Sequence, residues 1–365
     1  MVKRLAIVVF NLGGPDRPEA VKPFLFNLFN DPAIIGAPKP VRWLLAKFIS
    51  SRRAPVAREI YEHLGGKSPL LEQTRSQADA LEKALADMAD TVKVFVAMRY
   101  WHPMTAETVH AVKDFSPDQI VLLPLYPQYS STTSGSSLKL WAEEALKQGL
   151  DVPTSTLCCY PDEVGLIDAL ALKIRDTLSN LSTNVRVLFS AHGLPKKVIA
   201  AGDPYQDQVE QTCDALVERL GFLGVDTANL DWTICYQSRV GPLEWIGPST
   251  DDEIIRAGKD GVAVVMVPVA FVSEHSETLV ELDIEYGALA RESGVPSYNR
   301  IMTVQCDPHF IRGLADQVRK TLLVPGQLRS CHDRKLCRDD KTRCPHAPDR
   351  MTKDKADVCI DACGV

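Results

Sequence analysis

The chain has 365 residues, of which 45% are hydrophobic and 24% charged, and its 47 acidic and 41 basic side chains give a net charge of −6. This composition is typical of a globular protein with a large core, and the length favours two domains over one. The negative charge argues against a nucleic-acid-binding protein, because binding to phosphates requires a concentrated positive field.

The sequence carries no sign of a membrane span or of secretion. No apolar run approaches the roughly 20 residues that a membrane-spanning helix requires, and the start, MVKRLAIVVFNLGGP, does not have the form of a signal peptide. We therefore expect a cytoplasmic protein. In that compartment the ten cysteines are interpreted as thiols or metal ligands rather than as disulfides.

Short apolar, β-branched runs predict six strands with helical segments between them. They lie at 4–10, 92–98 and 119–125 in the first half and at 186–191, 231–236 and 261–271 in the second. Near-continuous apolar strands that alternate with helices are typical of parallel sheets covered on both faces. The sequence predicts an α/β protein with two doubly wound, Rossmann-like domains, at 1–150 and 151–325, and an active-site cleft between them.

Polar or backbone-breaking residues follow each predicted strand. Because ligands of open α/β sheets bind at the carboxyl ends of the strands, we expect these loops to converge on one site. The first of them, NLGGP (11–15), lacks the G-x-G-x-x-G pattern of dinucleotide loops. No nucleotide cofactor is therefore expected.

His192 ends the apolar run VLFSAH, and the following Gly-Leu-Pro prevents the chain from continuing as strand or helix. A lone histidine at a strand end is often only structural. A neutral imidazole at the ligand-binding end of a strand can also accept a proton or bind a divalent metal ion, and we expect His192 to do one or the other.

An acidic line follows the last predicted strand. On an α-helix, Glu277, Glu281 and Glu285 share one face, with Leu282 and Tyr286 on other lines. No Lys or Arg between Phe271 and Ala290 offsets their repulsion. The line is either a solvated acidic face or a ladder of carboxylates that conducts a cation or protons, with shifted pKa values.

Several long motifs together resemble the ferrochelatases, which insert ferrous iron into a porphyrin. The resemblance extends from NLGGP to about residue 325, and its motifs are RYWHP (99–103), YPQYSSTTSGSS (126–137), VLFSAHGLPKKVIAAGDPY (187–205), QSRVGPLEWIGP (237–248) and SEHSETLVELDIEY (273–286). It implies that Fe²⁺ and a porphyrin are the substrates, and it favours protoporphyrin IX, although the sequence leaves protoporphyrin and coproporphyrin open. A cobalt-inserting chelatase and a non-catalytic porphyrin or iron carrier are the alternatives.

The resemblance also implies roles for individual residues. His192 and Glu277 would face each other across the porphyrin as iron ligand and proton acceptor, in an order that the sequence leaves open. Glu281 and Glu285 would continue as a path for protons or iron. The residues implied in porphyrin binding are Arg53, Tyr61, Ser68, Arg99 and Tyr126.

The segment from Trp43 to Ile49, which Arg52 and Arg53 follow, combines apolar and basic side chains. It is either an ordinary amphipathic helix or an apolar lip that meets the porphyrin and touches a membrane surface. A monomer and a homodimer both remain open.

The C-terminal extension (326–365) has few large apolar residues and half of all the cysteines, so it cannot form a core of its own. Some ferrochelatases hold a [2Fe–2S] cluster with cysteines of such an extension and one of the body. The resemblance implies that the ligands come from Cys331, Cys337, Cys344, Cys359 and Cys363, with Cys158 or Cys159 from the body. Ser131 stands where we would align the animal body cysteine. Zinc bound with His332 or His346, and a reduced extension without metal, are the alternatives.

Overall fold

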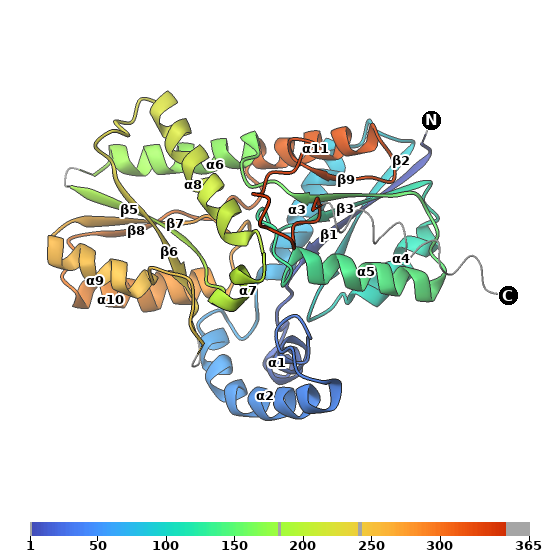
Figure 1. The fold of residues 1–365 in the computed structure, drawn as a ribbon, viewed down its shortest axis with the longest axis horizontal. Helices are drawn as coiled ribbons and strands as arrows, with labels where there is room; N and C mark the ends of the chain where they lie inside the picture. The colour runs from blue at the N-terminus through green and yellow to red at the C-terminus, as the bar shows by residue number, and fades with distance from the viewer. Residues whose placement is uncertain (1, 182–183, 240–242, 348–365) are drawn as a thin grey trace.

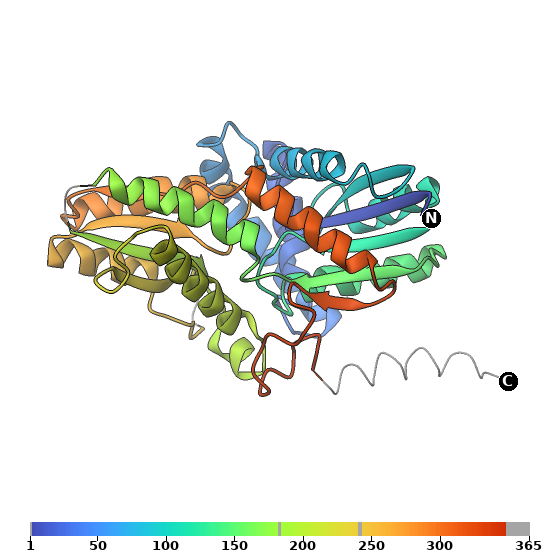
Figure 2. The same cartoon turned by 90° about the horizontal axis from the view of Figure 1, so that it is seen from above.

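The computed structural model describes residues 2–181, 184–239 and 243–347, and it contains two parallel β-sheets (Figures 1 and 2). The first sheet has the order β2-β1-β3-β4-β9, with β1 (Arg4–Asn11), β2 (Thr91–Met98), β3 (Gln119–Pro124), β4 (Thr154–Cys159) and β9 (Leu328–Ser330). The second has the order β6-β5-β7-β8, with β5 (Val185–His192), β6 (Asp231–Gln237), β7 (Ala263–Pro268) and β8 (Tyr298–Arg300).

Helices cover both faces of each sheet, as the sequence predicts. Those of the first half are η1 (Pro18–Ala20), α1 (Val21–Phe29), α2 (Lys39–Glu62), α3 (Leu70–Ala84), α4 (Thr105–Phe115) and α5 (Ser134–Gln148). The remaining helices are α6 (Val164–Ser179), α7 (Lys196–Ala200), α8 (Tyr205–Phe222), α9 (Thr250–Asp260), the π-helix η2 (Glu277–Glu285), α10 (Tyr286–Glu292) and α11 (Pro308–Leu322). No helix in these described ranges is long and apolar enough to cross a membrane.

All six predicted strands are present, but the sheets contain three more. The first sheet continues past residue 150 through β4, and it takes its edge strand β9 from the C-terminal extension. β8 and β9 have only three residues each, and β4 begins with the polar residues Thr-Ser-Thr, so none of the three has the long apolar run that identified the others. The doubly wound fold is thus confirmed, whereas the domain limits near 150 and 325 stay a prediction.

The apolar runs form strands because both of their faces are buried. In β1 the side chains of Leu5, Ile7 and Val9 enter one apolar cluster, and those of Ala6, Val8 and Phe10 enter another, against α4 and α5. Successive side chains of a strand point to opposite faces, so an unbroken apolar sequence fits a sheet covered on both sides.

One apolar core joins the two sheets. Side chains of the first sheet (Ile7, Val121) and of the second (Phe189, Val265) belong to the same buried cluster, together with residues of α3, α6, α8 and α11. In Figure 1, α6 and α11 lie end to end along the upper side of the two sheets. By contrast, α1 and α2 form an arm that projects from the junction of the sheets and packs through a separate cluster that includes Phe24 and Tyr61.

Candidate functional site

His192 stands at the carboxyl end of β5 with a fixed ring orientation. Its Nδ1 lies 2.7 Å from the carbonyl oxygen of Gly193, and because a carbonyl only accepts, Nδ1 must carry the proton. In the neutral ring the lone pair is then on Nε2, the atom that faces Glu277. A glycine follows because a Cβ at position 193 would lie 2.9 Å from the carbonyl oxygen of Gln237. The lone pair of His192 is therefore available for a proton or a metal ion.

Glu277 lies between two imidazoles. Its Oε1 is 3.8 Å from Nε2 of His192, and its Oε2 is 3.5 Å from Nε2 of His275. Burial raises the pKa of Glu277, but the charge of His192 when protonated, a hydrogen bond from His275 and the charge of His275 when protonated together outweigh burial and hold the pKa at about 2. An ionised carboxylate and imidazole lone pairs that face one another are stabilised by a proton or a cation between them. The structure therefore brings His192 and Glu277 together, but 3.8 Å leaves no room for a porphyrin between them. The expectation that they face each other across the ring is wrong, and their roles stay a prediction.

His275 is a member of this group that the sequence interpretation missed. Its Nδ1 lies 3.2 Å from the carbonyl oxygen of Ser273, and the imidazole packs edge-on against Phe271 with ring centroids 4.6 Å apart. The available signal was its position two residues before Glu277, in a loop that follows a strand. The helical spacing of the glutamates does not include His275, because His275 precedes the helix.

Glu281 occupies a polar cradle next to Glu277. Its carboxylate accepts hydrogen bonds from the backbone N–H of Ser238 at 2.8 Å, from the Ser238 hydroxyl at 2.6 Å and from the Gln237 amide at 3.2 Å. Burial and the charge of Glu277 raise the pKa of Glu281. The environments thus push the pKa values of two neighbouring carboxyl groups apart, a pattern that marks acid–base sites.

The helix that carries these carboxylates has π rather than α geometry. Its hydrogen bonds run from i to i+5, so residues five apart come into line. Glu281 therefore meets Tyr286, whose hydroxyl lies 3.2 Å from Oε1 of Glu281. The expectation that Tyr286 lies on another line is wrong for this reason. Glu285 is exposed, and its side chain makes no hydrogen bond or ion pair within the part of the chain that the structure describes.

Arg300 of β8 holds the π-helix in place. Its guanidinium binds Asp283 of η2 through two nitrogens, at 2.5 and 2.6 Å, and Glu274 at 2.7 Å. Glu274 also accepts the backbone N–H of Thr303. From the other half, the side-chain amide of Gln77 in α3 bonds to the carbonyl oxygens of Val272 and Gln305. These contacts fix the loop before η2 against both halves.

The five residues predicted to bind porphyrin divide into three groups. Tyr61 of α2 hydrogen-bonds to Ser276, beside Glu277, and burial raises its pKa to about 12. Arg99 forms a 2.7 Å ion pair with buried Asp31, and Tyr126 lies beside it. Ser68 is buried and caps the backbone N–H of Leu70, whereas Arg53 is exposed. Only Tyr61 thus reaches the His192–Glu277 group through a contact of its own.

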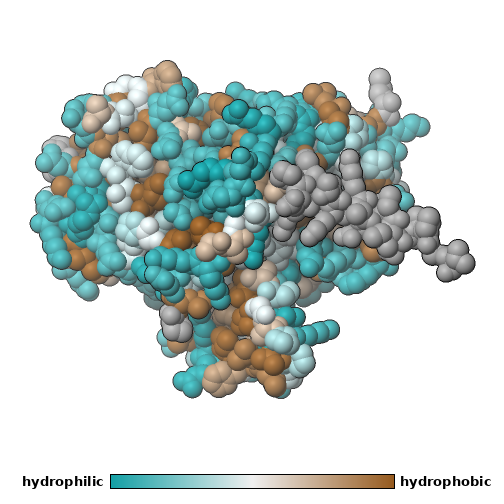
Figure 3. Space-filling view, viewed as in Figure 1, coloured by the Kyte–Doolittle hydropathy of each residue, from teal (hydrophilic) through white to brown (hydrophobic). Residues whose placement is uncertain are grey.

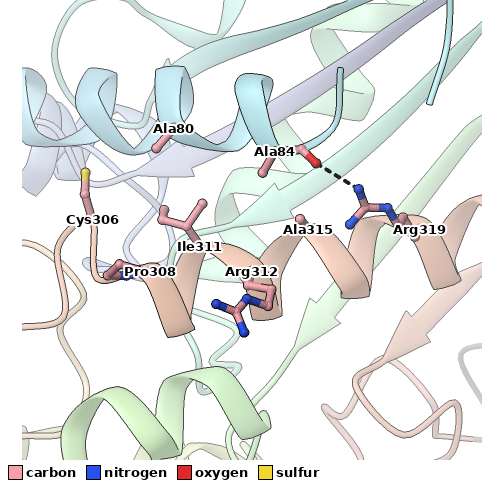
Figure 4. Close-up of a pocket in the computed structure, with 8 residues that line it drawn as sticks. All are labelled: Ala80, Ala84, Cys306, Pro308, Ile311, Arg312, Ala315 and Arg319. Carbon is pink, nitrogen blue, oxygen red and sulfur yellow. Dashed lines mark hydrogen bonds between the residues drawn. The ribbon is translucent and has the colours of Figure 1, made fainter. Parts of the chain in front are cut away.

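A surface hollow of about 360 Å³ lies between α3 and α11 (Figure 4). It is lined by Ala80, Ala84, Cys306, Pro308, Ile311, Arg312, Ala315 and Arg319. Arg319 closes one end, where its guanidinium donates to the carbonyl oxygen of Ala84. The hollow shares no residue with the His192–Glu277 group, and its mostly aliphatic lining offers no acid–base pair.

Four buried thiols lie close together where the C-terminal extension crosses β4 and α8. Sγ of Cys158 and Sγ of Cys159 are 3.4 Å apart, and the amide of Gln208 hydrogen-bonds to Cys159 and to Cys337. Cys337 in turn donates to Cys344, which lowers the pKa of Cys344 to about 6. We call Cys158, Cys159, Cys337 and Cys344 the thiol group.

Cys331 has a different environment. Its Sγ lies 3.2 Å from Oδ1 of Asp162, whose Oδ2 lies 2.8 Å from Nε2 of His332. The ligand atoms of these three residues all lie within 4.8 Å of one another, a donor set that suits zinc. Cys359 and Cys363, the last two predicted cluster ligands, lie outside the described residues.

Comparison with known proteins identifies the family of this chain. The family model described as Ferrochelatase matches residues 4–322. Ferrochelatase from Caulobacter vibrioides (strain NA1000 / CB15N) is 54% identical over 94% of this chain and 98% of its own, and ferrochelatase from Hyphomonas neptunium is 46% identical over 99% of both. A solved structure of SirB from Bacillus subtilis with Fe³⁺ shares the fold, with a TM-score of 0.50, 13% identity and coverage of 87% of this chain and 95% of SirB. The chain belongs to the ferrochelatase family.

Proposed function

We propose that His192, Glu277 and His275 form the centre at which this enzyme inserts Fe²⁺ into a porphyrin. Metal insertion requires a group that removes two pyrrole N–H protons and a group that binds the incoming ion as it loses water. The observation that carries the proposal is the orientation of His192, whose Nε2 lone pair faces the carboxylate of Glu277 at 3.8 Å. Both tasks need lone pairs that converge on one point.

The electrostatics of the centre support a direction for proton movement. Glu277 is ionised at neutral pH, because its pKa is held at about 2, and it can bind Fe²⁺ or accept a proton. Glu281, whose pKa is raised, takes up a proton more readily. Protons that leave the ring centre would therefore pass toward Glu281.

The ring edge is proposed to lie between α2 and the junction of the sheets, with Arg53, Tyr61, Ser68, Arg99 and Tyr126 as the residues around it. Tyr61 supports this position, because it joins α2 to Ser276 next to the centre. The test is anaerobic incubation of the purified chain with Fe²⁺ and either protoporphyrin IX or coproporphyrin. We expect haem from protoporphyrin IX; insertion of Co²⁺ in strong preference to Fe²⁺ would contradict the proposal.

The exposed face of α2 is apolar, which supports the interpretation of the segment from Trp43 to Ile49 as an apolar lip. Figure 3 shows brown side chains gathered at the end of the projecting arm, and Trp43, Leu44 and Phe48 are 45, 61 and 62% exposed. Lys47 lies over the ring of Trp43 and Arg52 over that of Phe48. An apolar face with flanking cations is the pattern of helices that lie on anionic membranes. We infer that the lip contacts a membrane surface peripherally when it collects or releases the tetrapyrrole.

Replacing Phe48 by aspartate is expected to reduce sedimentation with phosphatidylglycerol-containing vesicles by about 10-fold, because it places a charge in the apolar face. The matched control is Leu146→Asp, since Leu146 is also highly exposed but lies on α5. Equal sedimentation of the two variants would contradict a role of the lip in membrane contact.

The thiol group supports a [2Fe–2S] cluster, since thiolates are the ligands of such clusters. We infer that Cys337, Cys344 and one of Cys158 and Cys159 are three ligands, and that the fourth is Cys331 or one of the cysteines beyond residue 347. The lowered pKa of Cys344 favours the thiolate that a cluster requires. His346 lies next to Cys344, and its buried Nε2 has no hydrogen-bond partner in the described part of the chain. This polar atom is therefore left unsatisfied beside the thiol group. When bound, the cluster would add a redox-active group and tie the extension to β4.

Cys337→Ser is expected to remove the visible absorption and the reduced-state electron paramagnetic resonance signal of a [2Fe–2S] cluster from anaerobically purified protein. Cys306→Ser is the control, because Cys306 is exposed and lies on the α11 side of the molecule. A wild-type protein that contains zinc and no cluster would favour the Asp162–Cys331–His332 site instead.

A further inference from the structure

Tyr286 bridges two carboxylates that belong to different helices. Its hydroxyl lies 3.2 Å from Oε1 of Glu281 and 3.2 Å from Oδ2 of Asp251. Tyr286 begins α10 and is only 6% exposed, whereas Asp251 is exposed in the first turn of α9. A continuous line of hydrogen-bonding groups therefore leads from the buried side of Glu281 to solvent.

The π geometry of η2 creates this line. In an α-helix the carboxylate of Glu281 would share a face with position 285, which here is exposed and makes no side-chain contact in the described part of the chain. The wider turn instead brings position 286 beneath Glu281. Of the described hydroxyl groups that bond to Glu281, those of Ser238 and Tyr286, only that of Tyr286 also bonds to a second carboxylate.

We propose that Tyr286 and Asp251 form the proton exit of this enzyme, in which protons pass from Glu281 through the phenol of Tyr286 to Asp251 and then to water. In each passage the O–H bond of protonated Glu281 breaks as its proton binds Oη of Tyr286, and the proton already on Oη moves to Oδ2 of Asp251. The phenol is neutral before and after, and no electron is transferred. Asp251 releases the proton to solvent, and two passages account for the two pyrrole protons.

The chemistry of each group suits its place. A phenol has one proton and can both donate and accept, so it conducts a proton without storing charge. Burial, and then the charges of Glu281 and Asp251, raise the pKa of Tyr286, so the phenol keeps its proton. The free N–H groups of the first turn of α9 favour the negative charge that Asp251 regains after release. Neither residue touches the substrate, so both act through Glu281.

The proposal rests on the proposed function of Glu277 and Glu281, and it is tested by Tyr286→Phe and Asp251→Asn. We expect each to lower kcat for metal insertion by at least about 10-fold, less than the roughly 10²–10⁴-fold contribution of a direct acid–base catalyst. KM for the metal ion and for the porphyrin should not change. The solvent deuterium isotope effect on kcat should increase, because proton release becomes limiting.

The matched control is Tyr298→Phe. Tyr298 is a half-buried tyrosine of β8 that packs against the same apolar cluster as Tyr286, and its hydroxyl donates to the carbonyl oxygen of Leu282 within η2 at 2.7 Å rather than to a carboxylate. Tyr298→Phe removes a hydrogen bond from the π-helix but leaves the relay intact, so kcat and the isotope effect should equal those of the wild type.

Three outcomes would overturn the relay. If Tyr286→Phe and Asp251→Asn both had the wild-type kcat and isotope effect while Glu277→Gln was inactive, the relay would be wrong but the proposed centre would still hold. If Tyr286→Phe and Tyr298→Phe lost kcat equally, Tyr286 would support the helix rather than conduct protons. A wild-type rate of Glu277→Gln would overturn both the centre and the relay.

Discussion

His192→Ala is expected to abolish metal insertion, with a loss of at least about 10³-fold in kcat, within the range for removal of a positioned acid–base group. The variant loses the nitrogen lone pair that faces Oε1 of Glu277. Porphyrin binding should remain, since the ring edge is proposed to contact other residues. The measurements are the rate of insertion of Fe²⁺ or Zn²⁺ and a fluorescence titration with porphyrin.

His110→Ala provides the control for His192→Ala, because His110 is exposed on α4 and pairs only with Asp114. Folding of the two variants can be compared by thermal unfolding; His192 is 37% exposed in its side chain, so its truncation leaves little buried void. Metal insertion by His192→Ala at the wild-type rate would remove His192 from the mechanism.

Glu277→Gln is expected to reduce kcat by about 10² to 10³-fold. The amide has nearly the same shape but neither the charge that binds Fe²⁺ nor the basicity that accepts a pyrrole proton. Glu292→Gln is the matched control, because Glu292 is exposed at the end of α10. A rate for Glu277→Gln equal to that of Glu292→Gln would exclude Glu277 from the chemistry.

The same substitution has an expected effect on acid stability. The folded protein holds the pKa of Glu277 at about 2, below the roughly 4.3 of an unfolded chain. A depressed carboxyl pKa contributes stability that is complete above the unfolded value and is lost as the pH falls toward the folded value. Between pH 5 and pH 2, as approximate limits, Glu277→Gln should therefore lose less stability than the wild type in urea unfolding. If Glu277→Gln and the wild type lost the same free energy of unfolding over this range, the charged contact of Glu277 with the two histidines would be contradicted.

The sequence predicted the features that depend on local patterns. The long apolar runs identified the central strands, and His192 could be placed because a strand ends there and a Gly-Leu-Pro segment follows. Its proximity to Glu277 followed from the resemblance and from the rule that parallel strands present their carboxyl ends at one edge. The assignment of iron binding and proton acceptance to these residues stays a prediction.

The features that the sequence did not predict depend on partners far away in the chain. The π geometry of η2 accompanies contacts with Gln77 of α3 and Arg300 of β8, and neither can be read from the spacing of the glutamates. The resemblance did imply that a body cysteine joins those of the C-terminal extension, but it did not imply the part of Gln208, whose amide bonds to Cys159 of β4 and to Cys337. The periodicity of a sequence indicates which face a residue would occupy on an assumed helix. It does not indicate whether an α-helix or a π-helix forms.

The single core beneath both sheets limits how a flat, rigid molecule can enter and leave. Separating the two sheets would break the packing of α6 against α11 within this core, at about 1.5–3 kcal/mol for each large apolar side chain that becomes exposed. By contrast, α1 and α2 pack on the rest of the molecule through a smaller cluster, in which Tyr100 and Trp101 come from the loop after β2. We therefore expect any opening of the site to a flat ring to involve displacement of α1 and α2 rather than separation of the two sheets.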